Sequence, residues 1–211
     1  MLKLKFLLFS FFSFFSFHAF SGEASPILEQ ECEAFNANFA EQLNPTKLLH
    51  RNAKEQLAEL TFKFDIVSYG NNGRNVQEID EIPHVALPVD NGWLLGSDRG
   101  EWGGSLVFKS NSGEQQNIID DNIKDIYKYP YGYIVTAGLG HMALSRGSIY
   151  LVTMKNKKYV AEKLHSLVAP PKTSWLTSSG ELLINHRNHA SSVFTSAGNL
   201  YRVNCKNIAS E

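Results

Sequence analysis

The residues best suited to chemistry gather in the stretch Gly96–Ser105, which reads GSDRGEWGGS. Asp98 and Glu101 stand three residues apart, and hydrolytic enzymes use two carboxyl groups of different pKa as acid and base. The alternative is a turn between strands, in which Arg99 bridges the two acids and the glycines take positive φ. Trp102 is either a binding anchor or a side chain that caps the core. We favour a binding loop and predict no catalytic residue in it.

Histidines supply the other candidate groups. His186 and His189 stand three residues apart in NHRNH, a spacing that suits a metal ion on a helix. Here the pair follows a strand, and a zinc site needs a third ligand that is not nearby in sequence. His141, in GLGHMAL, is a candidate base, with a hydrogen-bonded and partly buried histidine as the alternative. Nucleophile-elbow, zinc-protease, phosphate-loop and dinucleotide motifs are absent from the sequence, so we expect no metal ion and no cofactor.

Three segments beyond Ile82 follow one plan and position these groups. Each has a turn that ends in glycine, a short apolar strand, a polar or glycine-rich insert, and a second glycine that leads another strand. The units are residues 82–120, 121–164 and 165–205. The leading glycines are Gly92, Gly132 and Gly180, and the second ones are Gly104, Gly147 and Gly198.

A period of about 40 to 50 residues with several short strands per unit is typical of propeller blades. Over residues 82–203 the pattern resembles bacterial β-propeller proteins of the kelch, quinoprotein-like and WD40-like kind, although it lacks the Trp-Asp blade ending. The resemblance implies an architecture and no activity. We expect a mainly β fold, a small or incomplete β-propeller-like repeat with a short helical N-terminal segment. A β-sandwich or barrel is the alternative.

The three inserts occupy the same slot in their units, between the first apolar strand and the next. Equivalent loops of successive blades lie on one side, and loops at one end of a rigid β scaffold are where binding residues accumulate. The repeat therefore predicts one shared face. Its candidate binding residues are Asp98, Arg99, Glu101, Trp102, His141, Arg146, His186, Arg187 and His189.

The first 21 residues have the layout of a secretory signal peptide. Lys3 and Lys5 precede a dense apolar run, Phe6 to Phe17, and small residues follow it. The run is shorter than the roughly 20 residues of a spanning helix, which argues against the alternative of a membrane anchor. We expect a periplasmic or secreted protein that is not inserted in the membrane after cleavage.

The remaining chain divides into a helical segment, residues 22–60, and an all-β repeat domain, residues 61–211. In the first part, apolar residues recur at helical three- and four-residue steps; they are Ile27, Leu28, Cys32, Phe35, Phe39 and Leu43. Cys32 and Cys205 are the two cysteines of the chain. An even count in an exported protein predicts a disulfide that ties the two ends together, with two free thiols as the alternative.

Charge excludes two classes of partner. Without residues 1–21 the chain keeps 18 Lys and Arg against 21 Asp and Glu, a formal charge of −3. Nucleic acids and anionic membranes call for a basic excess, so we expect neither as a ligand. We expect a protein partner, as for an envelope inhibitor or immunity-type protein. The alternatives are an envelope hydrolase or lyase that uses Asp98, Glu101 and His141 or His186, and a carbohydrate-binding module built around Trp102.

Overall fold

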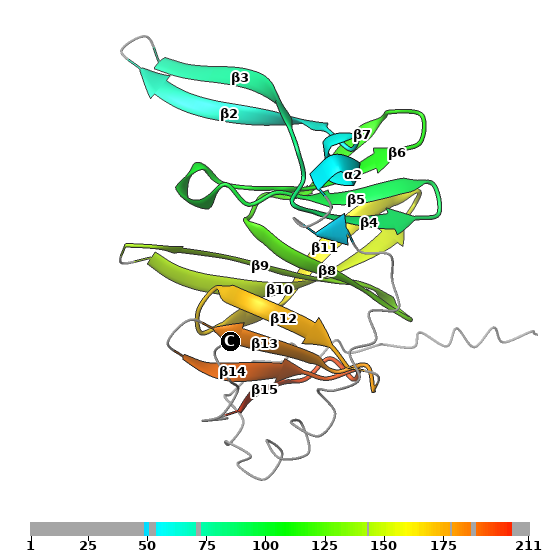
Figure 1. Cartoon of the computed structure of the whole chain (residues 1–211), viewed down its shortest axis with the longest axis vertical. Helices are drawn as coiled ribbons and strands as arrows, with labels where there is room; N and C mark the ends of the chain where they lie inside the picture. Colours follow the sequence, from blue (N-terminus) through cyan, green and yellow to red (C-terminus); the bar gives the residue numbers. More distant parts are fainter. Residues whose placement is uncertain are drawn as a thin grey trace, which may run out of the picture.

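The computed structural model describes residues 49–50, 54–70, 73–142, 144–177, 179–186 and 189–203, and Figure 1 shows their arrangement. This part of the chain is mainly β, as predicted, and its strands form four small antiparallel sheets. Within the described residues the sheets close into neither a barrel nor a propeller ring. None of the helices in these ranges is long and apolar enough to cross a membrane.

Three of the sheets follow one another along the chain. The first sheet is β1 (Leu49–His50), β4 (Val85–Val89), β5 (Gly92–Gly96), β6 (Leu106–Ser110) and β7 (Gln115–Ile119), in that order. The second sheet is β8 (Ile123–Tyr129), β9 (Gly132–His141), β10 (Leu144–Lys155) and β11 (Lys158–Leu167). The third sheet is β12 (Pro171–Leu176), β13 (Leu182–His186), β14 (His189–Phe194) and β15 (Leu200–Val203).

The three sheets stack face to face, with the second sheet in the middle (Figure 1). Successive residues of a strand point to opposite faces, so an apolar run can bury both faces of one sheet. Ile126 and Val135 pack toward the first sheet, whereas Tyr127 and Ile134 pack toward the third. All four are at most 5% exposed, which makes the second sheet the centre of two cores.

The outer face of the first sheet is covered by the chain that precedes it. α2 (Lys54–Ala58) and the fourth sheet, a hairpin of β2 (Phe62–Gly70) and β3 (Gly73–Glu81), lie on this side. Leu57 and Phe62 pack there against Ala86, Leu95 and Val107 of the first sheet. The hairpin is nine residues long on each side and projects beyond the stack, and β3 is largely exposed.

Several predictions concern residues outside the described ranges. They are the signal peptide (1–21), most of the helical segment (22–60), the Cys32–Cys205 bridge and the position of Arg187. In the described part of the segment expected to be helical, residues 49–50 form a strand that pairs with β4, and only residues 54–58 are α-helical.

One detail of the repeat was assigned to the wrong strand. Gly198 leads β15, the last strand of its sheet, whereas Gly104 precedes β6, which is followed in the first sheet by one further strand, β7. The strand of the third sheet that corresponds to β6 and β10 is β14. Its sequence, HASSVF, reads as a polar insert because two of its buried positions are Ser191 and Ser192.

Candidate functional site

The β5–β6, β9–β10 and β13–β14 connections of the three sheets lie on one side of the stack (Figure 1). In the first sheet this connection is residues 97–105; in the second it follows His141, and in the third it follows His186. The inserts that the repeat pattern aligned are therefore at equivalent edges of their sheets. Two of them, from the first and second sheets, are joined by side-chain contacts.

The loop of residues 97–105 is closed at its neck and hydrogen-bonded inside. The Ser97 N–H donates to the Ser105 carbonyl at 2.9 Å, and the Ser105 N–H donates to Ser97 Oγ at 3.0 Å. Near the tip, the Arg99 N–H donates to the Gly103 carbonyl at 2.8 Å, around the short 3-10 helix η2 (Gly100–Trp102). Gly100 and Gly103 have φ of +62° and +86°, the region that favours glycine. The GSDRGEWGGS stretch is thus a well-defined loop.

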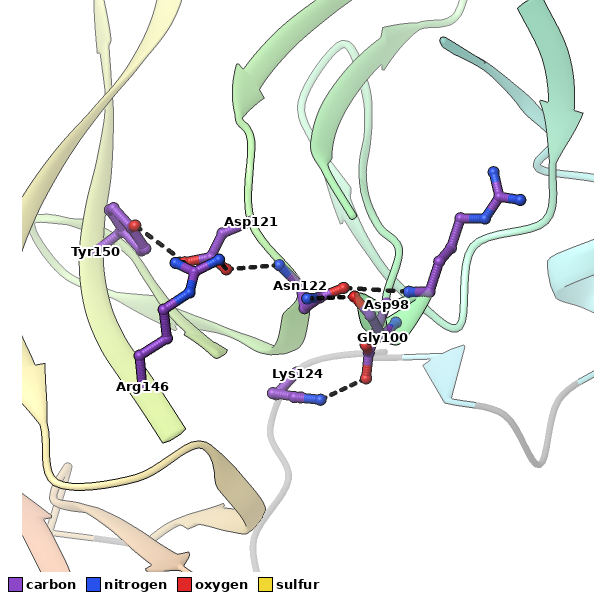
Figure 2. A network of polar contacts seen from close by, with 8 residues as sticks. Asp98, Gly100, Asp121, Asn122, Lys124, Arg146 and Tyr150 are labelled. Atoms are coloured by element: carbon purple, nitrogen blue, oxygen red, sulfur yellow. Dashed lines mark hydrogen bonds and ion pairs between the residues drawn. The ribbon is translucent and has the colours of Figure 1, made fainter. Parts of the chain in front are cut away.

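Asn122, from the connection between the first and second sheets, is hydrogen-bonded to this loop (Figure 2). Its Oδ1 accepts the Arg99 N–H at 3.2 Å, and its Nδ2 donates to the Gly100 carbonyl at 3.0 Å. Its own carbonyl accepts the Gly138 N–H of β9 at 2.9 Å. Asn122 is 1% exposed, so one buried amide holds the loop of the first sheet against the second sheet.

Asp98 is paired with Lys124, which lies outside the loop in β8. Lys124 Nζ donates to Asp98 Oδ2 at 2.5 Å, and the Gly100 N–H donates to Asp98 Oδ1 at 3.1 Å (Figure 2). Partial burial would raise the pKa of this carboxyl group. The bond and charge of Lys124, the Gly100 N–H and the nearby His84 outweigh burial and lower the pKa below its ordinary value.

This lowered pKa predicts a pH dependence. A carboxyl group whose pKa is lower in the folded than in the unfolded chain stabilises the fold above its unfolded pKa, about 3.9 for Asp. That stability is lost as pH falls through the folded pKa. We expect Asp98→Asn to lower stability at pH 7 and to flatten the loss below about pH 4. Urea unfolding at a series of pH values measures this, with the exposed turn residue Asp90→Asn as control. An unchanged acid limb in Asp98→Asn would contradict the assignment.

Asp121 forms the second ionic contact, directly beside Asn122. The Arg146 guanidinium lies 3.2 Å from Asp121 Oδ1 and 3.3 Å from Oδ2 (Figure 2). The Tyr150 hydroxyl donates to Oδ2 at 3.3 Å. Asp121 also accepts the Asn122 N–H at 2.8 Å. Asp121 is 3% exposed, whereas the Arg146 side chain is 56% exposed. A buried acid thus ties the β9–β10 hairpin to the same support as the loop, and Arg146 presents its outer edge to solvent.

Glu101 and His141 join the tips of the two connections. His141 Nε2 lies 3.2 Å from Glu101 Oε2, and both side chains are partly exposed. The residues that follow them are large, apolar and open to solvent. Trp102 is 72% exposed, Met142 94%, and Leu144, at the start of β10, 61%. Trp102 is therefore not part of the core; Trp102 and Met142 each directly follow one member of the Glu101–His141 contact.

Arg99 turns away from the acids of its own loop. Its guanidinium lies 3.6 Å from Glu81 Oε2 at the end of β3 and 5.0 Å from the centre of the Phe64 ring in β2. Partial burial raises the pKa of Glu81, and the charge of Arg99 only partly opposes this. Glu81 consequently favours the fold at low pH, and this contribution is lost as pH rises through its folded pKa. The contacts of the Arg99 guanidinium with Glu81 and Phe64 therefore lie outside its own loop.

The third sheet contributes histidines that serve its own structure. His186 is 7% exposed, and its Nε2 lies 2.9 Å from Ser192 Oγ. Burial lowers its pKa, although the carbonyls of Pro170 and Ala169 partly offset this. His189 is exposed and stands opposite His186 in the β13–β14 pairing. Among the described residues, Glu101 contacts His141, whereas His186 contacts Ser192 of its own sheet.

The sequence reasoning found the two connections but missed the residues beneath them. Asp121, Asn122 and Lys124 lie in DDNIK, which reads as an ordinary polar turn before a strand. Tyr150 reads as one residue of an apolar strand. The sequence feature that could have indicated them is the pair Asp120–Asp121 followed by Asn122, between two repeat units. In the described ranges no three His, Cys, Asp or Glu side chains are grouped as a metal site.

Comparison with known proteins assigns no family, because no family model, curated protein or solved structure matches the chain.

Proposed function

We propose that this protein is an exported, non-catalytic binding protein that recognises a protein partner through the surface formed by Trp102, Met142 and Leu144. The observation that carries the proposal is the exposure of Trp102 (72%) and Met142 (94%), which each follow one member of the Glu101–His141 contact. Exposed apolar clusters with polar rims mark interaction sites, and tryptophan is the residue most enriched among interface hot spots.

The rim of this surface supports recognition of a protein. Glu101 and His141 precede Trp102 and Met142 in the chain, and Arg146 lies two residues after Leu144; each of the three already contacts another polar side chain in the free protein. Their positions are set before binding, which lowers the entropy lost on association. The partner that fits presents an apolar hollow for Trp102 and hydrogen-bond acceptors for the exposed edge of Arg146.

Pairing of the acids favours binding over hydrolysis. The hydrolase alternative needs a carboxyl group and a base that converge on a substrate. Asp98 is held by Lys124 and the Gly100 N–H, and Glu101 by His141. These pairs stabilise the conformation of the loop, as a preformed recognition loop requires.

We further propose that the three stacked sheets are successive blades of an incomplete propeller. Each of the three sheets contains four strands that pair in chain order (β4 to β7, β8 to β11 and β12 to β15), and this shared connectivity is the one expected of propeller blades. Rigid stacked blades suit a recognition role because their loops can vary without altering the cores. With the signal-like residues 1–21, this supports a periplasmic or secreted binding protein, such as an inhibitor or immunity-type protein of the envelope.

The test compares capture by matched variants. The wild type, the double variant Trp102→Ala/Met142→Ala and the control Met154→Ala are immobilised and exposed to envelope extract. Met154 is 52% exposed on β10, outside the proposed surface. We expect a protein that the wild type and the control retain and the double variant loses. With that partner purified, we expect Trp102→Ala to weaken binding by about 30-fold or more, the range of a hot spot. Equal binding to all three variants would overturn the proposal.

A further inference from the structure

The β2–β3 hairpin has a strand edge that is free among the described residues. β2 and β3 form a two-stranded sheet, and no third described strand pairs with β3. Figure 1 shows the hairpin projecting beyond the stack, with β3 as its outer strand. A two-stranded hairpin is marginally stable in water, and a free edge is a template for pairing with another strand. The outer edge of β3 is therefore a candidate interaction surface.

The hairpin register identifies the backbone groups that β3 directs to this edge. Lys63 pairs with Asp80, and the Lys63 N–H donates to Gln115 Oε1 of β7 at 3.0 Å. The Lys63–Asp80 pair is therefore one that exchanges no hydrogen bonds within the hairpin, and such pairs alternate with bonded ones. Residues of β3 with the same parity as Asp80 direct their N–H and C=O groups to the free edge. They are Arg74, Val76 and Glu78.

The side chains along this edge are exposed, and their charges are divided between its two halves. β3 has one basic residue, Arg74, near the tip of the hairpin, whereas its acidic residues lie in the other half. Val76 is 46% exposed and the Glu78 side chain 59%. Lys63 lies 3.5 Å from Glu78 and closer to Asp80, at 3.1 Å. Glu78 thus keeps an open side toward solvent.

This division of charge is complementary to itself in an antiparallel pair. When two β3 strands pair with Val76 opposite its own copy, Arg74 of each chain stands opposite Glu78 of the other. The arrangement has the twofold symmetry of a homodimer, and opposite charges directly across a strand pair are stabilising. Parallel pairing in register would instead set each charge against its own copy, which is destabilising. The charges of the edge therefore favour a second copy of this chain in antiparallel orientation.

We propose that the free edge of β3 is a dimerisation surface, at which a second copy of this chain adds its own β3 and the two hairpins form one four-stranded sheet centred on Val76. Residues 73–79 of each strand pair, and the outward N–H and C=O groups exchange hydrogen bonds with the second copy. The apolar Val76 side chains meet at the twofold axis, between the two Arg74–Glu78 pairs. The proposal does not rest on the binding surface at Trp102, which belongs to other loops.

Reversal and exchange of the charges test the register. Sedimentation equilibrium at micromolar to submillimolar concentrations should show a monomer–dimer equilibrium for the purified wild-type protein. Arg74→Glu sets acid against acid twice in each dimer, so we expect it to weaken association by about tenfold or more. Arg74→Glu/Glu78→Arg exchanges the two charges and should restore association. The control Arg202→Glu makes the same charge change at an exposed position of β15 and should leave association unchanged.

Val76→Pro tests the backbone pairing itself. Proline lacks the N–H that Val76 directs to the free edge, so the edge loses a donor that the hairpin does not use. We expect this variant to be monomeric. In the wild type, which needs no substitution, hydrogen exchange of the Arg74, Val76 and Glu78 amides should slow as protein concentration rises. A wild type that stays monomeric, exchange at these amides that is independent of concentration, or a dimer that Arg74→Glu and Val76→Pro leave intact would overturn the proposal.

Discussion

Replacement of Gly104 by alanine is expected to lower the free energy of unfolding by about 3 kcal/mol. A Cβ atom at this position would lie 2.4 Å from the Ser97 carbonyl oxygen and 2.8 Å from both Asn122 Cα and the Asp121 carbonyl oxygen. All three contacts are with backbone, so no side chain can turn aside to relieve them. The loop and the connection between the sheets would have to separate.

That separation would break the contacts that position the proposed binding surface. The Ser97 carbonyl accepts the Ile123 N–H at 2.9 Å, and the Ser97 N–H is bonded across the neck of the loop. Loss of either bond leaves a buried polar group without a partner, which costs about 1–3 kcal/mol. We therefore expect Gly104→Ala to weaken partner binding as well as stability.

The control for Gly104 lies next to it. Gly103 has φ of +86°, but a Cβ atom there would meet nothing within 4 Å. Gly103→Ala therefore tests the conformational cost alone, which is about 1–2 kcal/mol. Urea unfolding of both variants and the wild type measures the difference, with an unchanged m value as the check on two-state behaviour. Equal losses in the two variants would show that the close approach at Gly104 has little energetic weight.

Asp121→Ala should destabilise the protein by a similar amount, about 3 kcal/mol. The substitution removes the acceptor of the Tyr150 hydroxyl and the Asn122 N–H, and it leaves Arg146 without its carboxylate. Asn122 is buried, so water replaces its lost partner only if the loop opens. Because Asn122 supports the loop, the change should also weaken partner binding.

Two comparisons separate charge from hydrogen bonding at Asp121. Asp121→Asn keeps an oxygen for the Asn122 N–H but loses the charge that holds Arg146, so we expect about half of the full loss. Asp120→Ala removes the neighbouring carboxylate, which bonds the exposed Asn117 side chain, and should cost less than about 0.5 kcal/mol. Chemical denaturation of the three variants measures these values. Equal losses for Asp120→Ala and Asp121→Ala would contradict the role given to Asp121.

The mainly β fold was predictable because it rests on local patterns. Short apolar runs such as GWLLG and LLINH alternate with glycine-containing turns, and the structure makes strands of both. The sequence pattern did not predict the strand β14, because two of its buried positions are serines. These serines are hydrogen-bonded, Ser191 to Asn185 and Ser192 to His186. A polar residue with a buried partner looks the same in sequence as a polar residue in water, so hydrophobic patterning cannot detect such a strand.

For the loop GSDRGEWGGS, the sequence by itself determined a polar, glycine-rich connection between two strands; the structure has positive φ at Gly100 and Gly103. Local conformational preferences decide such features, because neighbouring residues settle them. Only the tertiary structure decided the partners of its charges. Asp98 pairs with Lys124, and Arg99 pairs with Glu81. A long charged side chain can pair with several opposite charges at similar free energy. The stacking of the sheets decides which of these charges lies close enough to pair.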